Sequence, residues 1–200
     1  MNKLLALLAL SVVLYGQEYV GSHKCKICHR KASSGAQYSV WEETNHAHAY
    51  ETLRTDKAIK IAKGQGVEGN PWEAAECVRC HTTGFGKGGY EIRGASFWEE
   101  LDSRGKPTKG VKRMRGLQGV GCESCHGPGS QYKSKKKMEA IFRGELDGEE
   151  LGMQVPTEEV CRQCHNSEAT GKGEFVFKES YQKIAHPYPE EYRATGAEGE

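Results

Sequence analysis

Four segments of the chain repeat one order of chemically reactive residues: two cysteines separated by two residues, then a histidine. They lie at residues 25–29, 77–81, 122–126 and 161–165. Two thiols at this spacing can add to the two vinyl groups on one edge of a porphyrin, and the next residue can bind the iron as its proximal ligand. The sequence therefore predicts four covalently bound haem c groups, attached through Cys25, Cys28, Cys77, Cys80, Cys122, Cys125, Cys161 and Cys164, with His29, His81, His126 and His165 on iron.

The number of cysteines supports this interpretation. The chain has eight, and all eight lie inside the four motifs, so none is left for a structural disulfide or a reactive thiol. The alternative is a pair of zinc sites built from the Cys-x-x-Cys pairs. Zinc sites of that kind do not require a histidine directly after each pair, and this chain has one after all four.

The N-terminus has the pattern of a secretory leader. Lys3 gives a positive start, residues 4–14 are almost wholly apolar, and Leu14-Tyr15-Gly16 offers a cleavage site. We expect residues 1–16 to be a signal peptide and 17–200 to form a single tetrahaem domain. A retained membrane anchor is the alternative, but the apolar stretch is shorter than the roughly 20 residues of a spanning helix. We therefore expect a periplasmic protein with no stable membrane insertion after cleavage; an extracellular location is the alternative.

The composition is unusual for a chain that must bury a core. Hydrophobic residues make up 36%, charged residues 28%, and mean hydropathy is -0.71. Four porphyrins would supply the missing apolar surface. We expect the haems to form the core and the chain without them to be largely unfolded, because the free energy of cofactor binding is then free energy of folding.

Charge gives limited information about partners. The formal net charge is +1, and eight ionised haem propionates would bring it to about -7. Basic residues cluster at 104–115 and 133–137, and acidic residues at 145–150. Such clusters are most often solvated faces. Nucleic acid is excluded as a partner because no aromatic residues alternate with these lysines; redox proteins are the partners we expect, as electron donor and acceptor.

Local signals favour a mainly helical fold of short helices and loops with little β structure. We expect one helix over residues 34–54 and a last helix over 178–185, which ends before Pro187. Three further helices are expected to begin at Asn70-Pro71, at Ser96-Phe97 and at Pro156-Thr157. The glycine-rich stretches 82–94 and 105–121 are expected to be loop or short strand. No strong alternating strand pattern occurs.

Longer sequence motifs around the haem sites resemble those of a known protein family. Four segments carry this resemblance: Tyr19-Val20-Gly21, residues 41–47, residues 81–90, which begin His81-Thr82-Thr83-Gly84-Phe85, and residues 119–129. Together they resemble the tetrahaem cytochrome c-554 family, and the resemblance covers about residues 19–186. The resemblance implies a mainly helical fold wrapped around stacked haem pairs and a role as a periplasmic electron carrier. More distantly, the chain resembles tetrahaem extracellular nanowire cytochromes.

Four histidines lie outside the motifs: His23, His46, His48 and His186. The resemblance implies that His46 is the distal ligand of the haem on His165, and His186 that of the haem on His126. It also implies a five-coordinate iron at His81. Two imidazoles on one iron make a pure electron relay, whereas an open axial position allows ligand binding.

The haem on His29 departs from the family pattern. The family's distal histidine would lie shortly after the third motif, yet residues 130–137 contain no histidine. Met138, Lys135, His48 and His23 are the candidate ligands. A further hypothesis is that His23 or His48 binds a haem of a neighbouring subunit, so that the chains assemble head to tail into filaments. His23 lies in a segment expected to be exposed.

Three functions remain open on the sequence alone. The leading interpretation is an electron carrier; the alternatives are a filament subunit with the same chemistry, and a haem enzyme acting on a small nitrogen species at an open iron. No catalytic residue is nominated, since nothing distinguishes Glu123 or Asp102 from surface charge.

Overall fold

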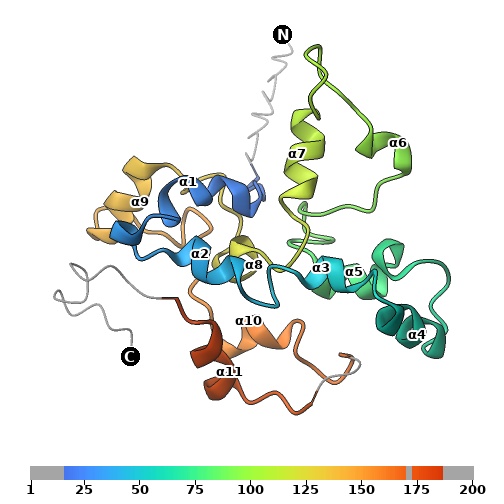
Figure 1. Cartoon of the computed structure of the whole chain (residues 1–200). Helices are drawn as coiled ribbons and strands as arrows, with labels where there is room; N and C mark the ends of the chain where they lie inside the picture. The colour runs from blue at the N-terminus through green and yellow to red at the C-terminus, as the bar shows by residue number, and fades with distance from the viewer. Residues whose placement is uncertain (1–15, 170–172, 187–200) are drawn as a thin grey trace, which may run out of the picture.

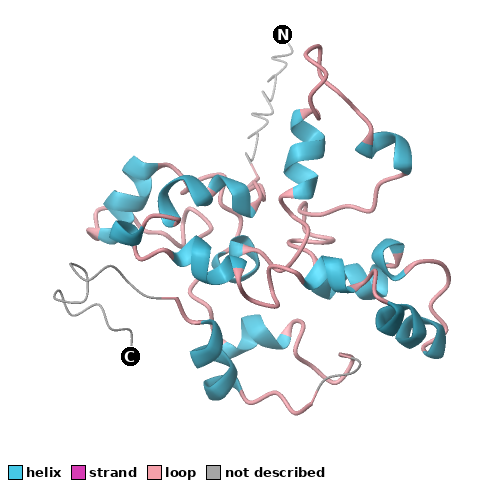
Figure 2. Ribbon diagram, in the orientation of Figure 1, coloured by secondary structure: helices cyan, strands magenta, loops and turns pink. Residues whose placement is uncertain are grey.

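The helices of this chain are short and joined by long loops (Figure 2). The structure is a computed structural model that describes residues 16–169 and 173–186; the expected leader lies almost wholly outside the described residues. The longest described helix has nine residues. Within these residues the only β pairing is two isolated bridges, Thr82 with Gln118 and Leu101 with Pro107. The expectation of a mainly helical fold is therefore confirmed.

The helices follow the chain in the order labelled in Figure 1. Three short 3₁₀ helices lie among them: η1 (Ser22–Lys24), η2 (Ala32–Ser34) and η3 (Pro71–Glu73). The α-helices are α1 (Lys26–His29), α2 (Gln37–Glu42), α3 (Ala49–Thr52), α4 (Asp56–Gly64), α5 (Ala75–His81), α6 (Ala95–Trp98), α7 (Lys109–Arg115), α8 (Cys122–His126), α9 (Lys135–Phe142), α10 (Glu158–Arg162) and α11 (Phe177–Ile184).

Side-chain caps explain where four of the helices begin. The hydroxyls of Thr55, Thr108, Ser134 and Thr157 each accept a hydrogen bond from the backbone N–H three residues later, at the start of α4, α7, α9 and α10. Only α10 was expected from the sequence. Helix α7 lies within the stretch expected to be loop or short strand, where Gly110 weakens the helical pattern; the cap and the burial of Val111 and Met114 outweigh that weakness.

The single helix expected over residues 34–54 is wrong. The chain there forms η2, α2 and α3, separated by turns. The Thr44 hydroxyl donates to the Trp41 carbonyl at 2.8 Å, and the Val120 N–H donates to the His46 carbonyl at 2.8 Å. Because these carbonyls bond outside the helical pattern, the chain turns between α2 and α3, and His46 lies in that turn.

The remaining helix predictions are met with small shifts. Asn70-Pro71 opens the 3₁₀ helix η3, where the Asn70 side-chain amide donates to the Glu73 carboxylate at 2.9 Å, and α5 follows. Helix α6 begins at Ala95, and α11 spans Phe177–Ile184.

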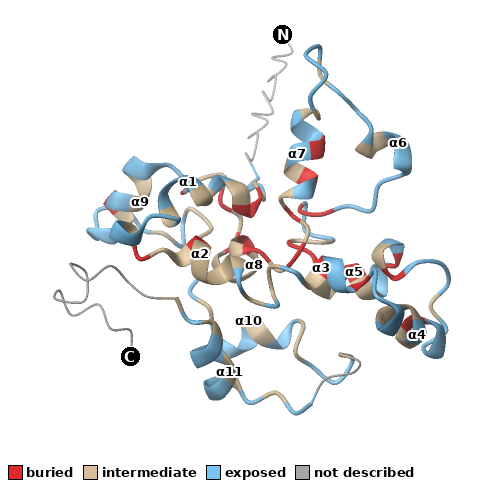
Figure 3. Ribbon diagram, viewed as in Figure 1, coloured by how far each residue is buried: buried red, intermediate tan, exposed pale blue. Residues whose placement is uncertain are grey.

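The apolar core is small and lies between α3, α5 and α7. Its buried members are Tyr50, Leu53, Val78, Tyr90, Met114 and Leu117. Figure 3 shows buried residues on α5, α7 and α8 in the middle of the molecule, whereas α10 and α11 have none. Six such side chains are few for the described residues 16–169 and 173–186, which agrees with the expectation that cofactors complete the core.

None of the helices in the described part of the chain is both long and apolar enough to span a membrane.

Candidate haem site

Each of the four motifs forms a single helical turn. Motif 1 is α1 with Cys25 as its N-cap, motif 2 ends α5, motif 3 is α8, and motif 4 begins in α10. In motif 4 the turn continues past the helix end, because the His165 N–H donates to the Cys161 carbonyl at 2.9 Å. Residues three apart on a helical turn share a face. Both thiols of each motif therefore lie on one side, as attachment to one porphyrin edge requires.

The rings of three motif histidines are oriented through Nδ1. His81 Nδ1 lies 2.6 Å from the Ala49 carbonyl oxygen, His29 Nδ1 lies 3.2 Å from Oε1 of Gln37, and His126 Nδ1 lies 3.3 Å from the Gln154 carbonyl oxygen. An Nδ1–H that donates to an oxygen fixes the tautomer whose Nε2 carries the lone pair. These contacts leave Nε2 as the atom that would bind iron.

Two pairs of imidazole rings lie next to each other in the structure, with interplanar angles of 80° for His46 and His165 and 40° for His126 and His186. The centroids of His46 and His165 are 6.0 Å apart, and those of His126 and His186 are 5.8 Å apart. Two metal–nitrogen bonds of about 2 Å each, with the depth of two rings, give a centroid separation on the order of 6 Å across one metal ion. The structure thus brings together the two ligand pairs that the resemblance implies, although their partners are far apart in sequence.

Burial favours the neutral imidazole, which is the form that binds a metal ion, in both His126 and His186. It lowers the pKa of His126, and burial followed by the charge of His126 lowers the pKa of His186. A histidine binds a metal ion only in its neutral form, so a lowered pKa keeps more of the imidazole ready to bind near neutral pH.

Motifs 1 and 3 touch through their first cysteines. The Cys25 thiol donates to the sulfur of Cys122; this hydrogen bond, followed by burial, raises the pKa of Cys25 well above its usual range. The same hydrogen bond lowers the pKa of Cys122. None of the eight cysteines is in a disulfide. All eight are therefore available for haem attachment.

Motif 4 lies next to both motif 3 and motif 2. Burial, and then the charge of Cys161, raises the pKa of Cys125 to about 11, which places motif 4 within electrostatic reach of motif 3. On its other side, Arg79 of motif 2 forms an ion pair with Glu168, and Lys87 Nζ donates to Gln163 Oε1 at 3.1 Å. Through these contacts the four attachment sites follow one another in the order 2, 4, 3, 1. Motif 3 also contacts the segment after motif 2, where the Ser124 hydroxyl donates to Thr83 Oγ1 at 3.2 Å.

A glycine before motif 3 allows this arrangement. Gly119 has a φ of 86°, and a Cβ at this position would meet the Ala47 carbonyl oxygen, so a side chain is excluded there. The Gly119 N–H donates to the His81 carbonyl at 3.1 Å, and the neighbouring Val120 N–H donates to the His46 carbonyl. The segment before motif 3 thus holds two of the site histidines in place.

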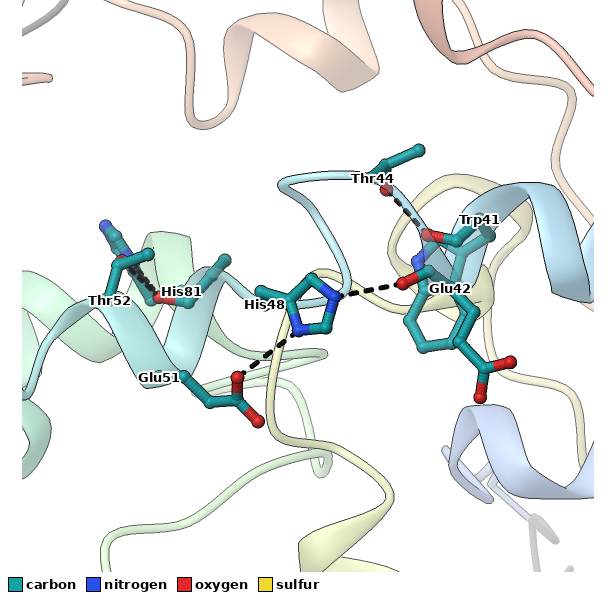
Figure 4. Close-up of polar contacts among 8 residues, drawn as sticks. Trp41, Glu42, Thr44, His48, Glu51, Thr52 and His81 are labelled. Atoms are coloured by element: carbon teal, nitrogen blue, oxygen red, sulfur yellow. Dashed lines mark hydrogen bonds and ion pairs between the residues drawn. The ribbon is translucent and has the colours of Figure 1, made fainter.

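His48 is engaged within its own chain (Figure 4). Its Nε2 lies 3.0 Å from the Glu42 carbonyl oxygen, and its Nδ1 lies 3.2 Å from Oε2 of Glu51. Both ring nitrogens have oxygen partners, so the described conformation does not present His48 to an iron.

The expectation that His23 lies in an exposed segment is wrong. Gly21 and Ser22 are buried, His23 is half-buried, and its Nδ1 is buried with no hydrogen-bond partner. Cβ atoms built at Gly21 or Gly116 would collide with the His23 ring. Burial, and then the charge of Lys24, lowers the pKa of His23. The His23 ring, which belongs to η1, packs against Gly116 at the end of α7.

Both α9 candidates for the haem on His29 are described. Lys135 is exposed and its Nζ forms an ion pair with Glu139 at 3.5 Å, whereas the Met138 side chain is half-buried. Ligation by either residue stays a prediction.

The burial of Glu123 could not be predicted from the sequence. Glu123, which the sequence did not separate from surface charge, is 2% exposed. Only the folded chain brings its partners to it, since Val20 is over a hundred positions away.

Similar proteins were found in three comparisons. The sequence profile described as "Cytochrome c554 and c-prime" matches residues 24–127. Cytochrome c-554 of Nitrosomonas europaea is 33% identical over 159 residues, which span 74% of this chain and 57% of that relative. The structure of reduced cytochrome c554 from Nitrosomonas europaea matches with a TM-score of 0.51 and 28% identity, covering 90% of this chain and 82% of that one.

Proposed function

Because this chain belongs to the cytochrome c554 family and is a tetrahaem c-type cytochrome, we propose that it carries electrons between redox proteins in the periplasm. The observation that carries the proposal is the pairing of imidazole rings, His46 with His165 and His126 with His186, at 6.0 and 5.8 Å. An iron with an imidazole on each side has no position left for a substrate, so it can only exchange electrons.

The residues of this chain fit the cofactor. The eight motif cysteines would hold four haems by thioether bonds, with His29, His81, His126 and His165 as proximal ligands. His46 and His186 would complete two of the sites. Each bound haem supplies a one-electron iron couple. The protein orients three of the proximal rings through the oxygens of Ala49, Gln37 and Gln154.

The order of the attachment sites supports a relay function. Motif 2 contacts motif 4, motif 4 lies beside motif 3, and motif 3 contacts motif 1. Motifs 1 and 2 are therefore at the two ends of the series. We place the docking of donor and acceptor at these two ends, since partners that approach opposite ends do not compete for one surface.

The N-terminal pattern supports the proposed location and domain organisation. Lys3 and the apolar residues 4–14 support export, with residues 1–16 removed and 17–200 as one tetrahaem domain. The contacts between motifs 1 and 3 and between 2 and 4 support one domain, because each joins segments more than eighty residues apart.

Spectroscopy and kinetics of the exported holoprotein test this function. Intact mass should show four haems, and the ferric spectrum should contain low-spin bis-imidazole signals. When the reduced protein is mixed with a chemical oxidant, its haems should become oxidised. A chemical reductant should reduce them again, and the cycle should be repeatable.

The two alternatives have distinct signatures in the same preparation. Catalytic turnover of nitrite, hydroxylamine or nitric oxide by the holoprotein would replace the carrier function with an enzymatic one. Filaments in negative-stain microscopy, in place of discrete particles, would favour a wire built from many copies.

A further inference from the structure

Glu123 is a buried acidic residue inside a haem attachment motif. It directly follows Cys122 in the first turn of α8, and only 2% of it is exposed. Acidic side chains are almost never fully buried without a partner, because the loss of hydration costs free energy. The partners of this carboxylate therefore indicate what it does.

Every hydrogen bond of this carboxylate comes from a backbone N–H group. Val20 N lies 2.8 Å from Oε1 and 3.1 Å from Oε2, Gly21 N lies 2.7 Å from Oε2, and Gly129 N lies 2.7 Å from Oε1. Both oxygens act only as acceptors, which is the pattern of the ionised form. A proton on either oxygen would point at a hydrogen-bond donor instead of an acceptor, which disfavours the protonated form.

Dipoles, and not cations, stabilise this charge. Among the ion pairs of residues 16–169 and 173–186, none includes Glu123. A carboxylate held by N–H dipoles keeps its full negative charge, whereas a neighbouring lysine or arginine would cancel its field at longer range.

The field of this charge reaches the cysteines of two motifs. The carboxylate directly follows Cys122 in the chain, and its partner Gly21 lies four residues before Cys25. Its charge adds to the hydrogen bond that Cys25 donates to Cys122, and to burial, in raising the pKa of Cys25. It opposes the hydrogen bonds that lower the pKa of Cys122. These two thiols belong to motifs 1 and 3. Glu123 is thus a fixed negative charge at the junction of two haem attachment sites.

We propose that Glu123 sets the redox properties of the motif 1 and motif 3 haems, lowering their reduction potentials relative to those of motifs 2 and 4. Reduction adds an electron, and a buried anion nearby disfavours that addition. At an effective dielectric constant near 20, a unit charge about 10 Å away changes such an equilibrium roughly tenfold. The inference rests on the proposed carrier function and gives the relay a direction, with electrons favoured at the motif 2 end.

A matched pair of substitutions tests the proposal. Glu123→Gln removes the buried charge at nearly constant shape. Glu68→Gln makes the same change at an exposed residue outside all four motifs, where water screens the charge. Both are measured as four-haem holoproteins in a redox titration followed by electron paramagnetic resonance.

We expect two of the four midpoint potentials to rise in Glu123→Gln, by about tenfold in the ferric-to-ferrous equilibrium, or 59 mV for a one-electron couple. The other two should stay where they are in the unsubstituted protein, and Glu68→Gln should leave all four unchanged. Potentials that are the same in both variants and in the parent protein would overturn the proposal, while four intact low-spin haems would still support the carrier function.

A second variant covers a failure of Glu123→Gln to mature. Glu123→Asp keeps the charge but shortens the side chain that binds Val20, Gly21 and Gly129. We expect faster amide exchange at residues 20–21 in Glu123→Asp, with the lower pair of potentials retained. A rise of that pair despite the retained charge would show that packing, and not charge, sets the potentials, and would overturn the proposal.

Discussion

Two histidines that lie two positions apart illustrate how much a side chain's role depends on its immediate contacts. His46 lies in the turn between α2 and α3, and its ring lies next to that of His165, with the centroids 6.0 Å apart. His48 caps α3, and both of its nitrogens bond to oxygens of Glu42 and Glu51 (Figure 4). The residue types are identical, so the difference lies entirely in what each ring touches.

Substitution of these two histidines should therefore give opposite results. His46→Ala removes the second imidazole at the His165 site, and we expect one haem of the four to change from low spin to high spin. His48→Ala is the matched control and should leave the ferric spectrum unchanged. Electron paramagnetic resonance of the oxidised holoproteins measures both, and an unaltered low-spin spectrum in His46→Ala would contradict the assignment.

The half-buried His23 ring predicts a pH dependence of stability. Burial lowers its pKa in the folded protein, whereas the unfolded chain has the ordinary value of about 6.5. Protonation therefore favours the unfolded state, so stability is full above about pH 6.5 and is lost as pH falls from there toward the lowered folded pKa. Between pH 7.5 and pH 5, the melting temperature should fall less in His23→Gln than in the parent protein. Parallel melting curves over that range would exclude this role.

Short helices can position ligands here because long-range backbone contacts replace helix length. The break at residues 43–48 is stabilised by the bond from Val120 N–H to the His46 carbonyl and by the Trp41 indole, which donates to the Val120 carbonyl at 2.9 Å. A continuous helix would carry the His46 ring away from His165. The helical periodicity that predicted one element over 34–54 contains no information about these bonds, since their partners lie some seventy residues away.

The contact between η1 and the end of α7 gives a test at the level of elements. A Cβ at Gly116 would collide with the His23 ring, so we expect Gly116→Ala to destabilise the fold by about 1–3 kcal/mol. Gly64→Ala is the control, because nothing lies within 4 Å of its Cβ, and it should stabilise α4 by roughly 0.5–1 kcal/mol.

Denaturant unfolding of the two holoproteins measures these changes. The double variant Gly116→Ala with His23→Ala should recover most of the lost stability, because it removes the ring that the new methyl group meets. Equal stability of Gly116→Ala and the parent protein would contradict the close packing of η1 on α7.

The molecule as a whole has a small apolar core and four haem attachment sites in series. Six buried side chains form the main cluster, while motif 3 contacts motif 1 through Cys25 and Cys122 and lies beside motif 4 through Cys125 and Cys161. Motif 1 is at one end of the series. Loss of an inner site should therefore cost more stability than loss of an outer one.

Removing one haem at a time tests this order. Cys122→Ala with Cys125→Ala abolishes attachment at motif 3, and Cys25→Ala with Cys28→Ala does so at motif 1. We expect the motif 3 variant to melt about 10 °C lower than the motif 1 variant, equivalent to several kcal/mol for a chain of this size. Intact mass confirms three haems in each, and calorimetry gives the melting temperatures. A lower melting temperature for the motif 1 variant would reverse the order.

Local spacing was sufficient to predict the four haems, because thioether attachment depends on residues within one helical turn. The eight attachment cysteines and the four proximal histidines rest on the same spacing and stay predictions. Local signals were also sufficient for the helical class of the fold. The proximity of His46 and His165, the order 2, 4, 3, 1 and the burial of Glu123 were decided only by the tertiary structure. Each of these joins residues far apart in sequence, and local pattern cannot specify such contacts because they form only when loops with no periodicity bring the segments together.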